Sequence, residues 1–405
     1  PDAFGHATYA QKPMQWLKQR QHLRFIDYYP EMEVFEGVGV KSITVHLSKN
    51  PHTGFEQRIH HDKQDFSTVV FDEYPEKMRL DAADSISANN ADTLYCLDEI
   101  CYSTKGIVGN SDEKKFQGEF IVSDLVSTVQ DALHPRPYFE GKDISKWHLN
   151  TLRWIEYGTD RSPSKWSRPG FPEMFAGDKL VTMRSPGYFP RTLLDSTGAF
   201  FNESAIGFKR WIDLKGVENN SLRNACSDAK RRAEYEEISS RFSLHFLLAL
   251  LNSTYVRYEL NTDRRSNIHI YPEDWKTIRI PKAAEAAEVQ QPFITAAEAL
   301  LGGHRALHEA EAKAGRLVRA ELGVAAPLTG KLALTQPWPT WSAALEKQLG
   351  RKLTLPEKST WLNYLTEFQE QQQQRRAVLQ AQDAALDQLV YQLYQLTPEE
   401  IALVE

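Results

Sequence analysis

The sequence lacks the features that mark membrane, secreted and zinc-binding proteins. No apolar run approaches the about 18 consecutive residues that a membrane helix needs, and the longest run covers only 246–251. Residues 1–10 have neither the basic segment nor the apolar segment of a signal peptide. The three cysteines, Cys96, Cys101 and Cys226, cannot form a disulfide framework and have no histidines at zinc-ligand spacing. We therefore expect a cytoplasmic protein.

The signatures of several enzyme classes are also missing. There is no G-x-x-x-x-G-K-[ST] phosphate loop and no G-x-S-x-G nucleophile motif. An adenine methyltransferase needs a Pro-Pro-aromatic turn and a glycine-rich cofactor loop, but "SPGY" at 185–188 lacks the second proline and "EGVGV" at 36–40 lacks the third glycine. "SDEKK" at 111–115 and "YPEDWK" at 271–276 match only the commonest form of a nuclease pattern. We expect no complete catalytic site, metal site or cofactor site in this chain, which disfavours an independent hydrolase.

Composition and charge indicate several globular domains, one of them basic. The chain has 405 residues, of which 41% are hydrophobic and 25% charged, so two or three domains are expected. The net charge of -6 divides into -8 for residues 1–133, +6 for 134–282 and -4 for 283–405. A basic middle region suggests an anionic partner, although chance can also produce such a drift. Because residue 1 is proline and no turn or cap precedes the first elements, we expect a part of a longer protein, the alternative being a processed or renumbered complete chain.

The first two regions read as a strand-rich start followed by a mixed, aromatic region. A short helix is expected over 15–23, and strands around 38–45 and over 55–60 flank a turn at 50–54, which predicts a long antiparallel hairpin. Residues 134–282 hold several tryptophans among many prolines and glycines. Within them "SLHFLLALLN" at 243–252 predicts a buried helix.

The last region predicts long helices. One is expected over 289–322, interrupted by Gly302-Gly303, and another over 356–396, with a shorter helix over 342–349 between them. Apolar residues recur in the second long helix at a period of 3.5, with a polar centre, which predicts an antiparallel helical hairpin or coiled coil. Such helices either pack against their own domain or form a stalk that docks a partner or a second copy.

Several strings resemble, in order, the C-terminal half of TaqI-like type IIG and phage-exclusion (BREX) adenine-N6 DNA methyltransferases. "HLRFIDYYPEMEVFEGVGVKSITVHLSKN" is similar to the last strands of the family's catalytic domain, and "PYFEGKDISKWHLNTLRWIEYG" to the start of its specificity domain. "KLVTMRSPG" resembles the strand that follows. "FSLHFLLALLNSTYVRYEL" with "NIHIYPEDWKTIRIPK" resembles a helix and a closing strand, and "ALDQLVYQLYQLTPEEIALVE" a terminal helix with its cap.

The resemblance implies an α+β fold in three parts. Residues 1–75 would be the end of a methyltransferase-type domain, 76–282 a mixed α/β DNA target-recognition domain and 283–405 a helical spacer. It also implies sequence-specific recognition of double-stranded DNA for phage defence or restriction-modification, with S-adenosylmethionine used by the parent enzyme. Neither catalytic motif of the family is present, so methyl transfer is not assigned to these residues. A methyltransferase or nuclease subunit, or a second copy, is expected as partner of the helices.

DNA contacts are expected from basic and amide side chains on loops of the middle region. Lysine and arginine on phosphates give affinity, and arginine or asparagine on base edges gives specificity. The expected DNA-binding residues are Lys105, Asn110, Lys114, Lys115, Lys142, Lys146, Arg161, Lys165, Arg168, Arg184, Arg191, Arg264, Arg265 and Asn267. Each could instead be a solvated charge or the partner of a carboxylate. The competing hypothesis is a protein-interaction or assembly module of a restriction or phage-defence complex.

Overall fold

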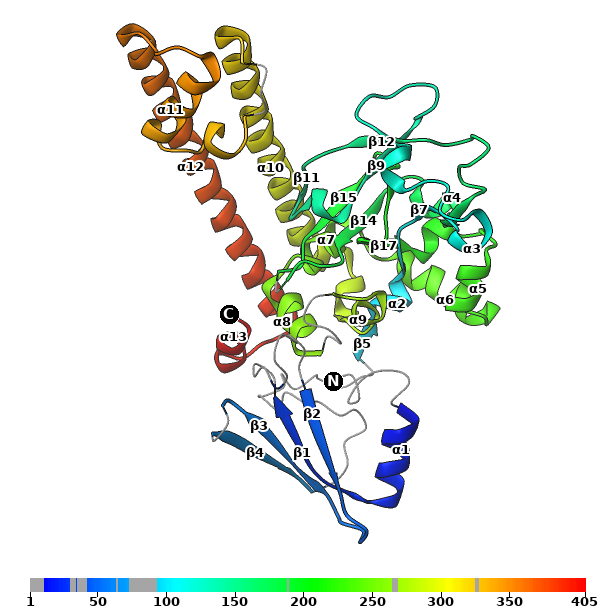
Figure 1. Cartoon of the computed structure of the whole chain (residues 1–405). Helices are drawn as coiled ribbons and strands as arrows, with labels where there is room; N and C mark the ends of the chain where they lie inside the picture. Colours follow the sequence, from blue (N-terminus) through cyan, green and yellow to red (C-terminus); the bar gives the residue numbers. More distant parts are fainter. Residues whose placement is uncertain are drawn as a thin grey trace.

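The computed structural model of the chain describes residues 11–29, 34, 42–62, 65–72, 93–187, 189–263, 269–324 and 328–405. These residues form several small sheets, short helices around them and two long helices near the C-terminus (Figure 1). The predicted α+β class is confirmed. Within the described part of the chain, no helix combines the length and apolar character needed to span a membrane.

The first region is a four-stranded sheet with one helix. Its elements are α1 (Gln11–Arg20), β1 (Leu23–Tyr29), β2 (Ser42–Leu47), β3 (Phe55–His60) and β4 (Phe66–Phe71). A small core forms where Leu17 of α1 contacts the side chains of Ile26 and Tyr28 on the inner face of β1. Gly54, before β3, has a φ of +94° and lies so close to the backbone at residues 71 and 72 that a side chain would not fit.

The strand pairing in this sheet corrects the predicted hairpin. The strand order is β2-β1-β3-β4, so β1 lies between the two strands that the sequence suggested would pair. β1 is antiparallel to β2 and parallel to β3. A turn pattern in the sequence indicates only that the chain reverses there, and it does not say which strands pair. β1 is largely buried, with Ile26 in the core, and it takes the central position between β2 and β3.

The central region contains two four-stranded sheets and three two-stranded ribbons. One sheet has the order β15-β14-β17-β6 and the other β16-β9-β12-β8. The ribbons are β7–β13, β10–β11 and β5–β18, and the last of these joins the two ends of the region. The bounds are β5 (Leu94–Cys96), β6 (Cys101–Lys105), β7 (Val108–Ser111), β8 (Val126–Ser127), β9 (Arg136–Phe139), β10 (Ile144–Ser145), β11 (His148–Leu149), β12 (Arg153–Ile155), β13 (Trp166–Arg168), β14 (Lys179–Met183), β15 (Thr192–Asp195), β16 (Phe200–Phe201), β17 (Ala205–Arg210) and β18 (Arg279–Pro281).

Helices cover the sheets and hold the main core. The predicted helix at 243–252 is confirmed as α7 (Leu244–Leu251), which is buried except at His245. Asn252 at its end exchanges two hydrogen bonds with the backbone of Thr192 in β15, at 3.0 and 2.9 Å. The other elements are α2 (Leu97–Ile100), α3 (Glu113–Phe116), α4 (Pro172–Phe175), α5 (Asn220–Ala225), α6 (Ala229–Ser240), α8 (Thr254–Asp263), α9 (Pro272–Lys276) and the 3₁₀ turns η4 (Val122–Leu125), η5 (Gly141–Asp143) and η6 (Trp211–Leu214).

The last region is the predicted antiparallel helical hairpin. α10 (Ala287–Leu322) and α12 (Leu355–Leu393) run side by side away from the central sheets, and α11 (Trp338–Leu349) lies at their far end (Figure 1). The predicted break at Gly302-Gly303 is wrong, because α10 continues through both residues. A Cβ at Gly303 would lie 2.6 Å from Leu379 Cδ2, so this glycine lets the two helices approach. η7 (Lys282–Glu285), η8 (Gly330–Leu332) and α13 (Pro398–Val404) complete the region.

The hairpin is fixed to the central region by polar contacts from α12. The Asp387 carboxylate accepts hydrogen bonds from the Thr254 backbone N–H at 2.7 Å and from its hydroxyl at 2.6 Å, at the start of α8. One turn earlier, Asp383 accepts from the Trp147 indole N–H at 3.2 Å and pairs with Lys146 at 2.9 Å. Carboxylates four residues apart lie on one helix face, so α12 holds two separate points of the central region.

Candidate nucleic-acid interface

Two of the expected DNA-binding cations lie at the Tyr271 ring, and a third lies on a neighbouring strand. Lys105 ends β6 and Arg184 directly follows β14, the two strands that flank β17 in one sheet. The Lys105 ammonium lies 5.0 Å and the Arg184 guanidinium 5.2 Å from the centre of the Tyr271 ring. Arg168, at the end of β13, is exposed and pairs in register with Val108, three residues after Lys105. We call Lys105, Arg168, Arg184 and Tyr271 the Tyr271 cluster.

The backbone around the cluster is fixed by hydrogen bonds. The Ile270 N–H donates to the Arg184 carbonyl at 2.8 Å, and the Ile270 side chain is completely buried. Tyr271 is the N-cap of α9, and its backbone N–H donates to the Asp274 carboxylate at 2.7 Å. The Arg184 N–H donates to the Ser204 carbonyl at 2.9 Å. Segments 20 and 86 residues away in the sequence therefore hold the backbone of Arg184 in place before any ligand arrives.

The electrostatics of the cluster favour an anion. Burial lowers the pKa of Lys105, and the charges of Arg184 and Arg168 lower it further, while Glu273 acts in the opposite direction. Among the residues that the structure describes, no carboxylate forms an ion pair with Lys105, Arg168 or Arg184. The Arg184 Nε is buried without a hydrogen-bond partner. Since like charges at close range repel, an anion such as a phosphate would recover free energy here.

His269 adds a titratable group to the same place. Its Nδ1 lies 2.6 Å from the Ser185 hydroxyl, and its ring meets the Tyr271 ring edge to face, 6.2 Å between centres. Burial lowers the pKa of His269, and Arg184 and Lys105 lower it further. Three expected DNA-binding residues directly precede it, namely Arg264, Arg265 and Asn267, and they lie outside the described residues.

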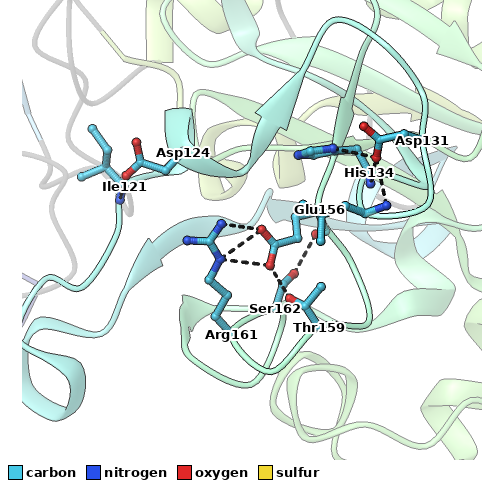
Figure 2. A network of polar contacts seen from close by, with 9 residues as sticks. Ile121, Asp124, Asp131, His134, Glu156, Thr159, Arg161 and Ser162 are labelled. Carbon is cyan, nitrogen blue, oxygen red and sulfur yellow. Dashed lines mark hydrogen bonds and ion pairs between the residues drawn. The ribbon is translucent and has the colours of Figure 1, made fainter.

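Two of the other expected cations support the loops that carry them. The Arg161 guanidinium donates to both oxygens of Glu156, whose side chain is only 2% exposed, and it lies 5.4 Å from the Phe120 ring centre. Figure 2 shows the Arg161 side chain directed at this carboxylate, which also accepts from Thr159. Lys165 pairs with Glu119 and Asp160, each at 3.4 Å. Arg161 and Lys165 therefore already pair with carboxylates of the protein.

The two expected lysines near β10 are also paired. Lys142 contacts Glu140 at 2.6 Å, and Lys146 contacts Asp383 of α12 at 2.9 Å. Trp147 is 3% exposed, and its φ of 69° places it in the left-handed region. Lys146 therefore helps to attach the central region to α12 of the helical hairpin.

The remaining expected residues with described positions, Asn110, Lys114, Lys115 and Arg191, are exposed. Lys114 and Lys115 are in α3, where the Asp112 carboxylate caps both of their backbone N–H groups. Asn110 Oδ1 accepts from the Val122 N–H at 2.6 Å. Arg191 is exposed, and its carbonyl accepts from Met183 and Thr182.

Sequence reasoning missed Tyr271 as the centre of the site. It lies in "YPEDWK", which the sequence offered as a nuclease-like string and as part of the closing strand of the family resemblance. The available signal was a tyrosine before the Pro-Glu-Asp of a helix start, next to the basic stretch at 264–269. Nothing in that string indicates that the Lys105 and Arg184 cations would lie close to the Tyr271 ring. Elsewhere in the described ranges, no group of three or more histidine, cysteine and acidic residues is arranged to hold a metal ion.

The chain is similar to a family of known sequences over the helical hairpin and to solved structures over most of its length. Residues 286–390, which form most of the helical hairpin, match a family described as "Domain of unknown function (DUF8810)". No curated protein matches the chain. A solved structure of the type IIL restriction-modification enzyme MmeI in complex with DNA is similar over 87% of this chain, with 12% identity and a TM-score of 0.37. The chain covers 46% of that protein's length, and a similarity this low carries no argument about function.

Proposed function

We propose that this chain is the DNA-recognition part of a restriction-modification or related DNA-modification enzyme, and that its central region binds duplex DNA. The observation that carries the proposal is the Tyr271 cluster, where Lys105 and Arg184 lie near one ring, Arg168 is on the neighbouring strand, and none of the three forms an ion pair with a described carboxylate. Fixed cations that repel one another are suited to a polyanion, because each phosphate contact relieves repulsion and releases counterions. The excess of basic residues in 134–282 supports the same partner.

The finer assignment follows the sequence resemblance. We propose that the parent enzyme methylates adenine N6 with S-adenosylmethionine, and that catalytic residues outside this chain bind the cofactor. The role of this chain is then to hold the duplex while a base is turned out toward the catalytic site. The helical hairpin, held to the central region by Asp383 and Asp387, would keep a partner domain or subunit at a fixed distance.

The second candidate function is an assembly module. The hairpin favours it, because the far end has a core of its own that includes Trp341 and Leu345, and a very exposed apolar residue, Leu355, at 81%. A protein-docking role would need no duplex binding by the central region. The same measurement therefore separates the two functions.

The test is a binding titration of the full chain with a random-sequence duplex over a range of salt concentrations. Duplex binding should weaken steeply with salt, because the slope of log K against log [salt] is about -0.9 for each phosphate neutralised. The double variant Lys105→Ala with Arg184→Ala should reduce the magnitude of that slope by roughly 2 if each cation neutralises one phosphate. Absent or salt-insensitive binding would contradict the proposal and favour the assembly module.

A matched control removes the same charge from elsewhere. Arg319 of α10 and Lys331 of η8 are exposed residues near the far end of the hairpin, so the variant Arg319→Ala with Lys331→Ala loses one lysine and one arginine as well. Its salt slope should match that of the wild type. If both double variants lose affinity equally, net charge rather than the Tyr271 cluster explains the binding.

A further inference from the structure

The two-stranded ribbon β7–β13 begins next to the Tyr271 cluster. β7 starts three residues after Lys105, and β13 ends at Arg168, which is paired in register with Val108. The positive charge of Arg168 contributes to lowering the pKa of Lys105. If the Tyr271 cluster binds a DNA phosphate, the β7–β13 ribbon beside it can reach the neighbouring base pairs.

One face of the ribbon is buried and the other is exposed. Trp166 is 4% exposed and its ring packs against Tyr157 and Phe200. Gly109 is buried against Val122, whose Cγ2 would lie 3.0 Å from a Cβ at that position. Asn110 and Arg168 are exposed. The ribbon is therefore supported on the core by its inner face and presents polar side chains on its outer face.

An irregularity in the pairing separates Arg168 from the buried side chain two residues before it. Trp166 pairs with Ser111 and Arg168 with Val108, so β7 advances three residues while β13 advances two. The extra residue of this bulge therefore lies in β7. Arg168, the last residue of β13, is exposed, whereas Trp166 is buried.

The two ends of the ribbon differ in charge. At the end near Ser111, Lys165 lies between Glu119 and Asp160, at 3.4 Å from each. At the other end, Arg168 lies near Lys105, and neither forms an ion pair with any carboxylate that the structure describes. Only the Arg168 end is suited to approach a polyanion. There the Arg168 guanidinium can donate hydrogen bonds to a ligand.

We propose that the β7–β13 ribbon enters the major groove of duplex DNA and that Arg168 reads a base edge there, while Lys105 and Arg184 of the Tyr271 cluster hold the adjacent phosphate. This assignment rests on the proposed function, duplex binding by the central region. The major groove, about 12 Å wide, accepts a two-stranded ribbon. The planar guanidinium matches the O6 and N7 acceptors of guanine, a match that a lysine ammonium does not reproduce as a fork.

The experiment selects duplexes from a randomised pool with the full wild-type chain and then compares the enriched duplex with a shuffled one. Arg168→Ala should lower affinity for the enriched duplex by about 5- to 150-fold, the range for one bidentate base contact, and should change affinity for the shuffled duplex much less. Arg168→Lys should keep binding to the shuffled duplex without restoring the preference. Lys105→Ala should weaken binding to both duplexes by the same factor.

Each outcome bears on one proposal or on both. A preference that survives in Arg168→Ala, or equal losses on the two duplexes, would overturn the reading role of Arg168 and leave duplex binding standing. A pool that binds with salt dependence but does not enrich would do the same. Absence of any duplex binding by the wild type would overturn both proposals. Circular dichroism of Arg168→Ala should match the wild type, because the side chain is exposed.

Discussion

A histidine stack between the central region and the helical hairpin should make the stability of the protein depend on pH. His148 of β11 and His308 of α10 stack with ring centres 3.7 Å apart and planes 10° apart. Burial lowers the pKa of His148 to about 4, and the charges of His308, His304 and Arg305 lower it further, while Glu311 raises it. Protonating His148 in the folded protein therefore places a charge in a half-buried junction beside other imidazoles.

The sign and size of the effect follow from this shift. Above pH 6.5 His148 is neutral in both the folded and unfolded chain, so its contribution to stability is complete. As the pH falls toward 4, the unfolded chain binds a proton that the folded chain does not, and the free energy of unfolding falls. At 1.36 kcal/mol per pKa unit, the loss is about 2 kcal/mol near pH 5 and at most about 3 kcal/mol below pH 4.

The test compares the wild type with His148→Phe. Phenylalanine keeps an aromatic ring to stack on His308 but cannot take up a proton. Urea unfolding near pH 7.5 and near pH 5 should show a larger loss of stability in the wild type than in His148→Phe, by about 2 kcal/mol. An NMR titration should place the His148 resonance, identified by its absence from the variant, well below 6.5. Equal losses in the two proteins, or titration of His148 near 6.5, would refute the reasoning.

Two further predictions concern how the hairpin is built and attached. Asp387→Ala removes the two hydrogen bonds to Thr254 at the start of α8, and should lower the free energy of unfolding by about 1–2 kcal/mol; in urea unfolding, Asp387→Asn should lose less, because an amide oxygen remains. Gly302→Ala has no atoms within 4 Å of the new Cβ and should stabilise the chain by about 0.5–1 kcal/mol. Gly303→Ala, whose Cβ would lie 2.6 Å from Leu379, should gain less or lose stability. Equal thermal unfolding temperatures for the two alanine variants would contradict the close approach of α10 and α12.

Local elements could be predicted from the sequence where one pattern dominates. The apolar string at 243–252 became α7 because seven of its side chains are buried, and Ser243 caps its start by accepting from the His245 N–H. The long helices followed from a period of 3.5 over many residues. The Gly302-Gly303 pair led to the wrong prediction of a helix break. A helix tolerates glycine where a neighbouring helix packs closely, as α12 does through Leu379 at Gly303.

Partners distant in the chain could not be predicted. The order of the first sheet depends on which strand takes the central position, and β1 takes it with antiparallel and parallel neighbours at once. Likewise, a string such as "TDRSPSKWSRPG" shows that Arg161 and Arg168 are cations on a loop. It does not show that Glu156 holds Arg161 while Arg168 has no such partner among the described residues.

The sequence by itself determined the class of the fold, the helical hairpin, the buried helix at 243–252 and the basic character of the middle region, because these depend on composition and on periods of a few residues. Only the tertiary structure decided which cations remain available to an anion. That choice depends on contacts between residues far apart in the sequence, such as those of Lys105 and Arg184 with the ring of Tyr271. Charge can be counted along a chain, but whether a charge has a partner is a property of three-dimensional distance.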